Sequence, residues 1–409
     1  MLSRLRRWSR YFYKVPWSVP AWGLCEYIAT IRCVLSGKVV IGPYSEAFAV
    51  AVKNHLELRY AIPVNRGRVA IELALRAMGV DKDDQVILPS YICRSVLDAV
   101  VRAGAAPTFV DIGPDLQITP DTIRTAITPK TKCVIVPHLF CKTAPIDNIE
   151  KLLHGTGIWL IDDAAQLFGS ECGGRKIGSF GDCGIVSCGP GKALAGAAGG
   201  LLVTNNKDLY EKAASISLGR EKQAAVARRV LSFWIWRRLR KYTLPIKILI
   251  DRVFGLQYEP PYVSCTMSNL DGAIALAQFR ALYKNNKIRH RNADLLLQAL
   301  GTIEKSSIYE FSRDDMFIKL VIVIPENGDT LNQIISALGN AGIEAQGGYF
   351  PLHIEQRYRS KPLPSTENLW DRVLCIPVDI EYKSLKKLLP STERWYIESK
   401  DILGFAKKL

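Results

Sequence analysis

Lys192 stands alone in a loop of small residues that begins at Ser187, and small residues continue after it to Gly200. Such a loop lets a bulky planar group approach the backbone, and burial beside another cation lowers the pKa of a lysine until its amine becomes nucleophilic. A nucleotide P-loop is excluded because Ala193, not serine or threonine, follows the lysine. We therefore expect Lys192 to act as an amine nucleophile.

Two acids, Asp162 and Asp163, end an apolar run, and Gln166 follows shortly after them. The carboxyl ends of strands are where open α/β sheets bind ligands. A buried acid there is costly unless it meets a cation or several donors, and a protonated pyridine ring is such a cation. Metal binding, or an ordinary carboxylate at a strand end, explains this motif equally well when it is taken alone.

A third motif, residues 65–68, precedes an amphipathic run and contains Gly67 and Arg68. Backbone amides at the start of a helix, together with the positive end of the helix dipole, could hold a phosphate group.

These motifs together resemble the DegT/StrS-type family of aminotransferases, which are fold type I enzymes that use pyridoxal 5′-phosphate and are best known for making amino sugars. The resemblance covers roughly residues 36–405 apart from an insertion. The matching segments, in the family's order, are residues 65–70, 88–91, 137–140, 162–166, 178–182, 187–192, 273–278 and 351–353.

The resemblance implies roles for individual residues. Lys192 would carry pyridoxal phosphate as a Schiff base and relay the proton, and Asp163 would keep the pyridine nitrogen protonated. The remaining cofactor contacts would come from Gly67, Arg68, Ser187, Gln166 and His138. His138 has a second interpretation, that of a structural histidine with both nitrogens satisfied. The expected reaction moves an amino group, from glutamate, to a keto sugar that is nucleotide-activated or lipid-linked, in polysaccharide, glycoconjugate or secondary-metabolite biosynthesis.

The sequence departs from the family at several positions that grip the cofactor or the substrate. Cys93 stands where an aromatic ring usually stacks on the cofactor, so Tyr91 could stack instead. Ser264 and Thr266 lie in the segment that normally reaches the active site of a partner subunit in a homodimer. These departures keep two alternatives open, an aminotransferase for a lipid or polyketide carbonyl and a catalytically silent binding protein with the same fold.

The elements that must position these residues follow an α/β pattern. From residue 60, short apolar runs alternate with amphipathic stretches, which predicts βαβ units around one large, mostly parallel sheet of the seven-stranded fold type I kind. After residue 262 the pattern predicts a smaller α+β domain with a long helix over 269–300. The predicted divisions are a basic arm over 1–35, a large domain over 36–219, a basic aromatic insertion over 220–262 and a small domain over 263–409.

Composition limits the class of protein. The ten cysteines include no Cys-x-x-Cys pair and no Cys/His cluster, so we expect neither a zinc site nor a disulfide framework, and a reducing cytoplasm fits best. No uncharged apolar run reaches the roughly 18 residues that span a bilayer.

The net charge of +15 is concentrated in two segments. Residues 1–14 carry +5 and residues 220–252 carry +8, which leaves +2 for the rest. On a helix Val226, Val230, Phe233 and Trp234 would share one face. Residues 220–252 could bind an anionic membrane surface, which would place the protein at the periphery of the inner membrane face. Alternatively, they could pack on the body of the protein. The N-terminal arm could lie on the same surface as this segment. Nucleic acid is not expected as a partner, since no nucleic-acid-binding module is visible.

Overall fold

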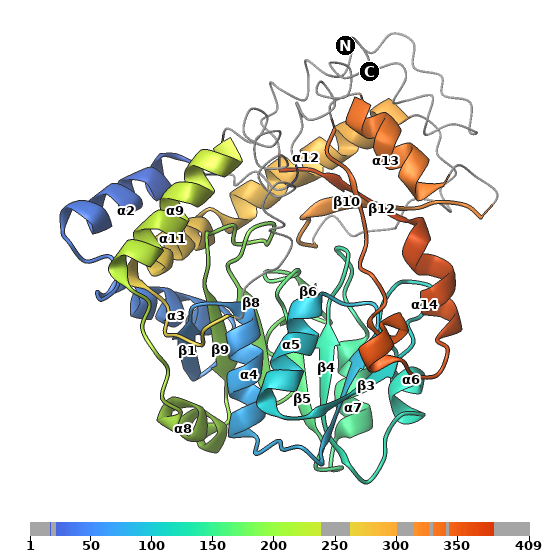
Figure 1. Cartoon of the computed structure of the whole chain (residues 1–409). Coiled ribbons are helices and arrows are strands. Elements are labelled where there is room, and N and C mark those ends of the chain that lie inside the picture. Colours follow the sequence, from blue (N-terminus) through green and yellow to red (C-terminus); the bar gives the residue numbers. More distant parts are fainter. Residues whose placement is uncertain are drawn as a thin grey trace.

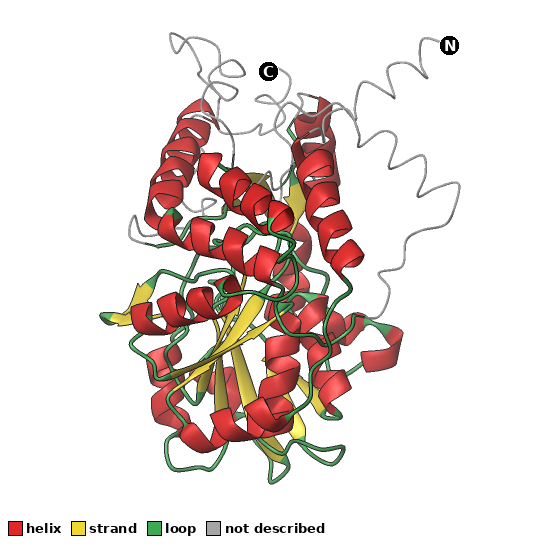
Figure 2. Cartoon of the chain, turned by 90° about the vertical axis from the view of Figure 1, so that its left-hand side faces the viewer, coloured by secondary structure: helices red, strands yellow, loops and turns green. Residues whose placement is uncertain are grey.

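The computed structural model describes residue 17 and residues 22–238, 262–300, 315–326, 330–340 and 343–379. In this part a central sheet is covered by helices, and a second, smaller sheet lies beyond the carboxyl ends of its strands (Figures 1 and 2). None of the helices there is long and apolar enough to cross a membrane.

The large sheet has seven strands in the order β1-β9-β8-β5-β4-β2-β3. Only β9 runs antiparallel to its neighbours, β1 and β8, and the other neighbouring strands are parallel. The predicted α/β class with a mostly parallel sheet is confirmed. The strands are β1 (Tyr60–Val64), β2 (Gln85–Pro89), β3 (Ala106–Val110), β4 (Thr131–Pro137), β5 (Trp159–Asp163), β8 (Cys183–Ser187) and β9 (Gly200–Thr204).

Helices cover both faces of this sheet, as alternation along the strands requires. In β4, Cys133 and Ile135 join the core beneath α4 (Gly67–Ala77), α5 (Arg94–Ala103) and α8 (Lys207–Ser215), whereas Val134 and Val136 join the core on the opposite face. That face is covered by α3 (Tyr44–His55), α6 (Pro120–Arg124) and α7 (Ile146–Leu153). A short hairpin, β6 (Glu171–Cys172) and β7 (Arg175–Lys176), lies outside both sheets.

The smaller sheet has the order β10-β12-β11 and is antiparallel throughout. Its strands are β10 (Lys319–Val323), β11 (Gln346–Gly347) and β12 (Val373–Pro377), and it is accompanied by α13 (Leu331–Asn340), α14 (Pro364–Leu369) and three short 3-10 helices, η2 (Leu352–Ile354), η3 (Gln356–Tyr358) and η4 (Trp370–Arg372). The α+β character expected after residue 262 is therefore present, while the exact domain boundaries remain predictions.

One local prediction was wrong. The long helix expected over 269–300 is two helices, α11 (Asn269–Arg280) and α12 (Leu282–Leu300), because the backbone at Ala281 leaves the helical region with φ −97° and ψ 1°. Strand β1 begins at residue 60, where the predicted alternation begins. Within the sheet it pairs with β9 alone, so it is an edge strand, where Pro63 is tolerated.

The described part of the basic insertion is α9 (Gln223–Arg238), which packs against α2 (Leu24–Leu35) and α11. Val226, Val230 and Phe233 are buried, and the ring centroids of Phe233 and Trp22 are 5.4 Å apart. Trp234, predicted on the same face, is 42% exposed, because one helical step past Phe233 turns its side chain about 100° away. Residues 239–261, which complete the insertion, and most of the basic arm lie outside the described residues.

Candidate active site

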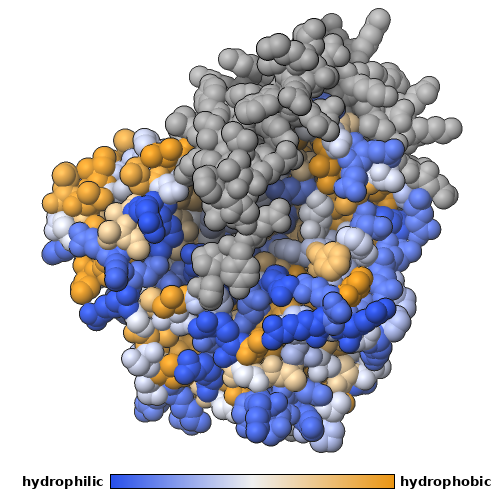
Figure 3. Space-filling view, in the orientation of Figure 1, coloured by the Kyte–Doolittle hydropathy of each residue, from blue (hydrophilic) through white to orange (hydrophobic). Residues whose placement is uncertain are grey.

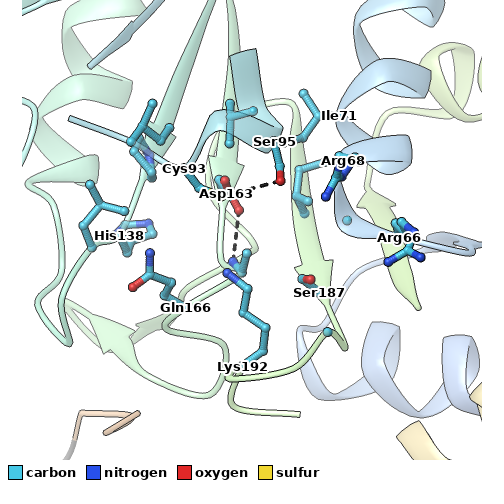
Figure 4. Close-up of a pocket in the computed structure, with 18 of the residues that line it drawn as sticks. Arg66, Arg68, Ile71, Cys93, Ser95, His138, Asp163, Gln166, Ser187 and Lys192 are labelled. Carbon is cyan, nitrogen blue, oxygen red and sulfur yellow. Dashed lines mark hydrogen bonds between the residues drawn. The ribbon is translucent and has the colours of Figure 1, made fainter. Parts of the chain in front are cut away.

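A cavity opens where β4, β5 and β8 end, next to the first residues of α4 and α5 (Figure 4). This is the carboxyl edge of the parallel strands, where the sequence placed its candidates. The structure brings eight of the eleven predicted site residues together in the lining of this cavity: Gly67, Arg68, Cys93, His138, Asp163, Gln166, Ser187 and Lys192.

Lys192 is held in the cavity by the tight loop that follows β8. Gly191 adopts a left-handed φ of 74°, which favours glycine, and the Lys192 amide donates to the Gly189 carbonyl at 3.3 Å. Burial lowers the pKa of Lys192, the neighbouring Cys93 and Asp163 raise it, and the like charge of Lys319 lowers it further. The loop therefore favours a neutral, nucleophilic amine.

Asp163 is buried at the end of β5 and is only partly satisfied. One carboxylate oxygen accepts a hydrogen bond from the Ala165 amide at 3.0 Å, and in the described part of the chain no donor reaches the other oxygen. Burial raises the pKa of Asp163, while the charge of Lys192 and the bond from Ala165 lower it. This carboxylate thus faces the cavity with the capacity to bind a cation.

The neighbouring Asp162 is fully satisfied and has a structural role. Its side chain accepts hydrogen bonds from the amides of Gly178 and Phe180 at 2.6 and 3.1 Å, and pairs with His138 Nε2 at 2.9 Å. Because the Ala144 amide donates to His138 Nδ1 at 3.0 Å, the proton of the neutral ring lies on Nε2, which donates to Asp162. His138 lines the cavity with its ring while both nitrogens are occupied, so the structural interpretation describes its hydrogen bonding.

The opposite end of the cavity is rich in positive charge and in small groups. A Cβ atom added to Gly67 would lie 2.9 Å from the Ser187 Cβ, so the start of α4 can approach β8 only with glycine at this position. The guanidinium of Arg66, the N-cap residue of α4, has no hydrogen bond or ion pair among the described residues, and its pKa is lowered by burial and by the charges of Arg229 and Arg68. Figure 4 shows both Arg66 and Arg68 on the Ser187 side of the cavity, across from His138 and Gln166. This end is suited to an anion.

Three predicted residues do not line the cavity. The Tyr91 ring is fully buried, stacks on Phe140 at 5.3 Å and lies against the smaller sheet, so the geometry does not support the suggestion that it stacks on a cofactor. Ser264 donates to Glu72 at 2.9 Å, and the Thr266 amide donates to the Gly219 carbonyl. Their contact with a partner subunit remains a prediction.

A second cavity lies on the other side of Lys192, between its loop and the smaller sheet. The two cavities share four lining residues, Cys93, Gln166, Pro190 and Lys192. The Gln166 side chain connects the two parts of the fold, because its Nε2 donates to the Tyr349 hydroxyl at 2.9 Å and its Oε1 accepts from the Phe140 amide at 3.4 Å.

Sequence reasoning missed several residues of these cavities, among them Arg66, Ser95 and Lys319. Arg66 lies within residues 65–68, the motif predicted to hold a phosphate, so its positive charge could have identified it as a site residue. Ser95 accepts a hydrogen bond from the Cys93 thiol at 3.5 Å, and Lys319 is the first residue of β10. The sequence contains no motif that marks Ser95 or Lys319 as a site residue.

Comparison with known proteins places these cavities in a family context. Residues 26–386 match the model of the DegT/DnrJ/EryC1/StrS aminotransferase family. The aminotransferase TlmJ from Streptoalloteichus hindustanus has a similar structure, with a TM-score of 0.73 and 22% identity over 92% of this chain and 96% of that one. PseC from Helicobacter pylori, an aminotransferase involved in pseudoaminic acid biosynthesis, matches with a TM-score of 0.74 and 18% identity. The match covers 97% of this chain and 100% of PseC. The putative sugar aminotransferase Spr1654 from Streptococcus pneumoniae, solved in its PMP form, matches with a TM-score of 0.72 and 18% identity. The match covers 96% of this chain and 99% of Spr1654. At these identities the likeness of the structures shows the fold.

Proposed function

Because this chain belongs to the DegT/DnrJ/EryC1/StrS aminotransferase family of pyridoxal-phosphate-dependent enzymes, we propose that it transfers an amino group from glutamate to a keto sugar in the Lys192 cavity. The observation that carries the proposal is the pairing of a desolvated lysine with a buried, half-satisfied carboxylate across one cavity. Burying two ionisable groups side by side is costly, and a site without chemistry has little need of such a pair.

The residues present fit pyridoxal phosphate. The open oxygen of Asp163 suits the protonated ring nitrogen, and the Ser187 hydroxyl, which has no partner among the described residues, lies beside the start of α4, where a phosphate would sit. Cys93, Gln166 and His138 form the walls between these two ends.

Each of these residues has a defined task in the reaction. When bound, pyridoxal phosphate supplies a carbonyl that condenses with amines and a ring that accepts electrons. Lys192 supplies a neutral amine and can accept and return a proton at Nζ, since its pKa is lowered. Asp163 would hold a positive charge at the ring nitrogen, and Ser187 with the amides of Gly67 and Arg68 would hold the phosphate.

The substrates belong to the proposal. PseC and Spr1654 are described as acting in sugar biosynthesis or on sugars, which supports a keto-sugar acceptor, either nucleotide-activated or lipid-linked. We also propose that the enzyme is a homodimer in which Ser264 and Thr266 face the partner subunit.

Absorption spectra of the purified protein with pyridoxal phosphate test the proposal. We expect a visible absorption band from the lysine-bound cofactor that bleaches when glutamate is added. In Lys192→Ala neither that band nor turnover should be seen, because the nucleophilic amine is gone.

Two outcomes would contradict the proposal. A parent protein without a visible band does not use Lys192 as proposed. A band that glutamate leaves unchanged, but that another amino acid bleaches, removes glutamate as the donor and keeps the transaminase site.

A further inference from the structure

The second cavity contains one charge that the proposed chemistry leaves unexplained. Lys319, the first residue of β10, lines this cavity together with Lys192 and Gln166. Its position is fixed by the smaller sheet, where it pairs with Pro377 of β12, and by the Cys141 thiol, which donates to its carbonyl.

Lys319 has aromatic neighbours and, among the described residues, no counter-ion. Its Nζ lies 5.2, 5.6 and 5.8 Å from the ring centroids of Phe140, Trp17 and Tyr349. Within the part of the chain that the structure describes, its ammonium forms no ion pair and no hydrogen bond. Ring faces attract the charge but accept none of its strong N–H hydrogen bonds, so the ammonium keeps donors for a ligand.

The acids near this cavity are already engaged. Asp379, which also lines it, is paired with the buried Arg289, and Glu344 accepts a hydrogen bond from the Trp17 amide. A negatively charged ligand therefore finds Lys319 available without displacing a protein carboxylate.

We propose that Lys319 binds a carboxylate of the amino donor, so that the second cavity receives the acidic part of the donor while its amine reaches Lys192. This inference rests on the proposed transaminase function. A carboxylate entering a cavity with aromatic walls needs a cation to offset its loss of water, and Lys319 is that cation. The shared lining of the two cavities brings donor carboxylate and donor amine to the same lysine loop.

The test uses glutarate, a dicarboxylate that lacks the amine, and titrates it calorimetrically into the enzyme loaded with pyridoxal phosphate. Losing one charge-assisted hydrogen bond should weaken glutarate binding by about ten- to a hundredfold in Lys319→Met. Lys319→Arg should recover most of the affinity, because it restores a cation at the same place. Lys151→Met, at an exposed lysine of α7, is the matched control and should bind glutarate as the parent does.

A second titration with n-butylamine, followed by the cofactor's absorbance, separates recognition from general damage. The inference predicts that Lys319→Met loses much less of its reaction with n-butylamine than of its affinity for glutarate. Equal loss for glutarate and n-butylamine, or unchanged glutarate affinity, would overturn it. So would a shift in the pH dependence of Lys192 without a change in glutarate affinity, since Lys319 would then act only through its like charge.

The outcomes are distinct from those of the transaminase proposal. If glutamate fails to bleach the cofactor band while glutarate binding depends on Lys319, the donor assignment fails and the carboxylate site stands. If glutamate bleaches the band while Lys319→Met binds glutarate normally, the transaminase stands and this inference fails.

Discussion

Asp162 and Asp163 are adjacent, identical in type and both buried, yet they have different roles. Successive residues of a strand point to opposite faces, so β5 directs one carboxylate to backbone amides and His138 and the other to the cavity. The difference between them is set by hydrogen bonding: Asp162 is fully satisfied, whereas Asp163 retains one open oxygen. That open oxygen is what makes Asp163 a candidate for chemistry.

Arg66 gives a prediction at the residue scale. Its guanidinium lines the cavity without a partner in the described chain, beside Gly67 and Ser187. We expect Arg66→Met to weaken pyridoxal phosphate binding about ten- to a hundredfold, because a charge-assisted contact with the phosphate is lost. Affinity for pyridoxal, which lacks the phosphate, should not change.

Equilibrium dialysis with both compounds checks this expectation. Arg76→Met serves as a control on the same helix, since Arg76 lies at the far end of α4, 48% exposed and paired with Glu72. A parallel loss of affinity for pyridoxal and pyridoxal phosphate would show that Arg66 supports the fold of the site and does not bind the phosphate.

At the scale of elements, close contacts between helices and strands set the position of the site. Helix α11 packs on α3 through Gly272, where an added Cβ would meet the Ser45 amide nitrogen at 2.5 Å. The same helix connects to α2, because Gln278 donates to Glu26 at 2.9 Å. Trp22, just before α2, donates to the Ala195 carbonyl in the lysine loop. The N-terminal helices are therefore linked to the loop that presents Lys192.

Gly272→Ala is predicted to destabilise the protein by about 1–3 kcal/mol, because backbone atoms of α3 leave no space for a methyl group. Helix propensity alone predicts the opposite sign, a gain of about 1 kcal/mol. Urea unfolding should show a lower midpoint for Gly272→Ala. In the control Gly23→Ala the new Cβ meets only a Glu26 oxygen at 3.7 Å, so we expect a smaller change. A raised midpoint for Gly272→Ala would contradict the packing of α11 on α3.

At the scale of the whole molecule, an apolar surface lies over α2 and α9. Figure 3 shows hydrophobic residues gathered at that end of the molecule. Leu24, Ile31 and Leu35 of α2 are 73%, 55% and 82% exposed, at spacings that place them on one helix face, and Leu231 and Trp234 of α9 are also exposed. Along the sequence, the basic residues 1–14 precede α2, and the basic residues 220–252 include α9.

We propose that this surface binds anionic membranes, since apolar side chains flanked by basic segments match the chemistry of a lipid surface. The protein should co-sediment with phosphatidylserine vesicles and not with phosphatidylcholine vesicles. Reversing the charges of Arg237, Arg238, Arg240 and Lys241 should abolish this, as each basic residue contributes about 1 kcal/mol. Replacing Leu24, Ile31 and Leu35 by serine should weaken it as well. Equal sedimentation of parent and variants would refute the proposal and favour packing against protein.

The sequence alone determined the elements and the chemistry that lie close together along the chain. The alternation of short apolar runs with amphipathic stretches predicted the mostly parallel sheet and the helices that cover it, because hydrophobic periodicity is a local signal. The lysine loop and the acids at the end of β5 were recognisable for the same reason.

Only the tertiary structure decided what depends on contacts between distant segments. It buried Tyr91 against the smaller sheet, occupied both nitrogens of His138, left one oxygen of Asp163 open and brought Lys319 to the cavity beside Lys192. Each of these outcomes depends on which atoms remain without a partner after folding. That is a property of packing in three dimensions, which spacing along one chain does not encode.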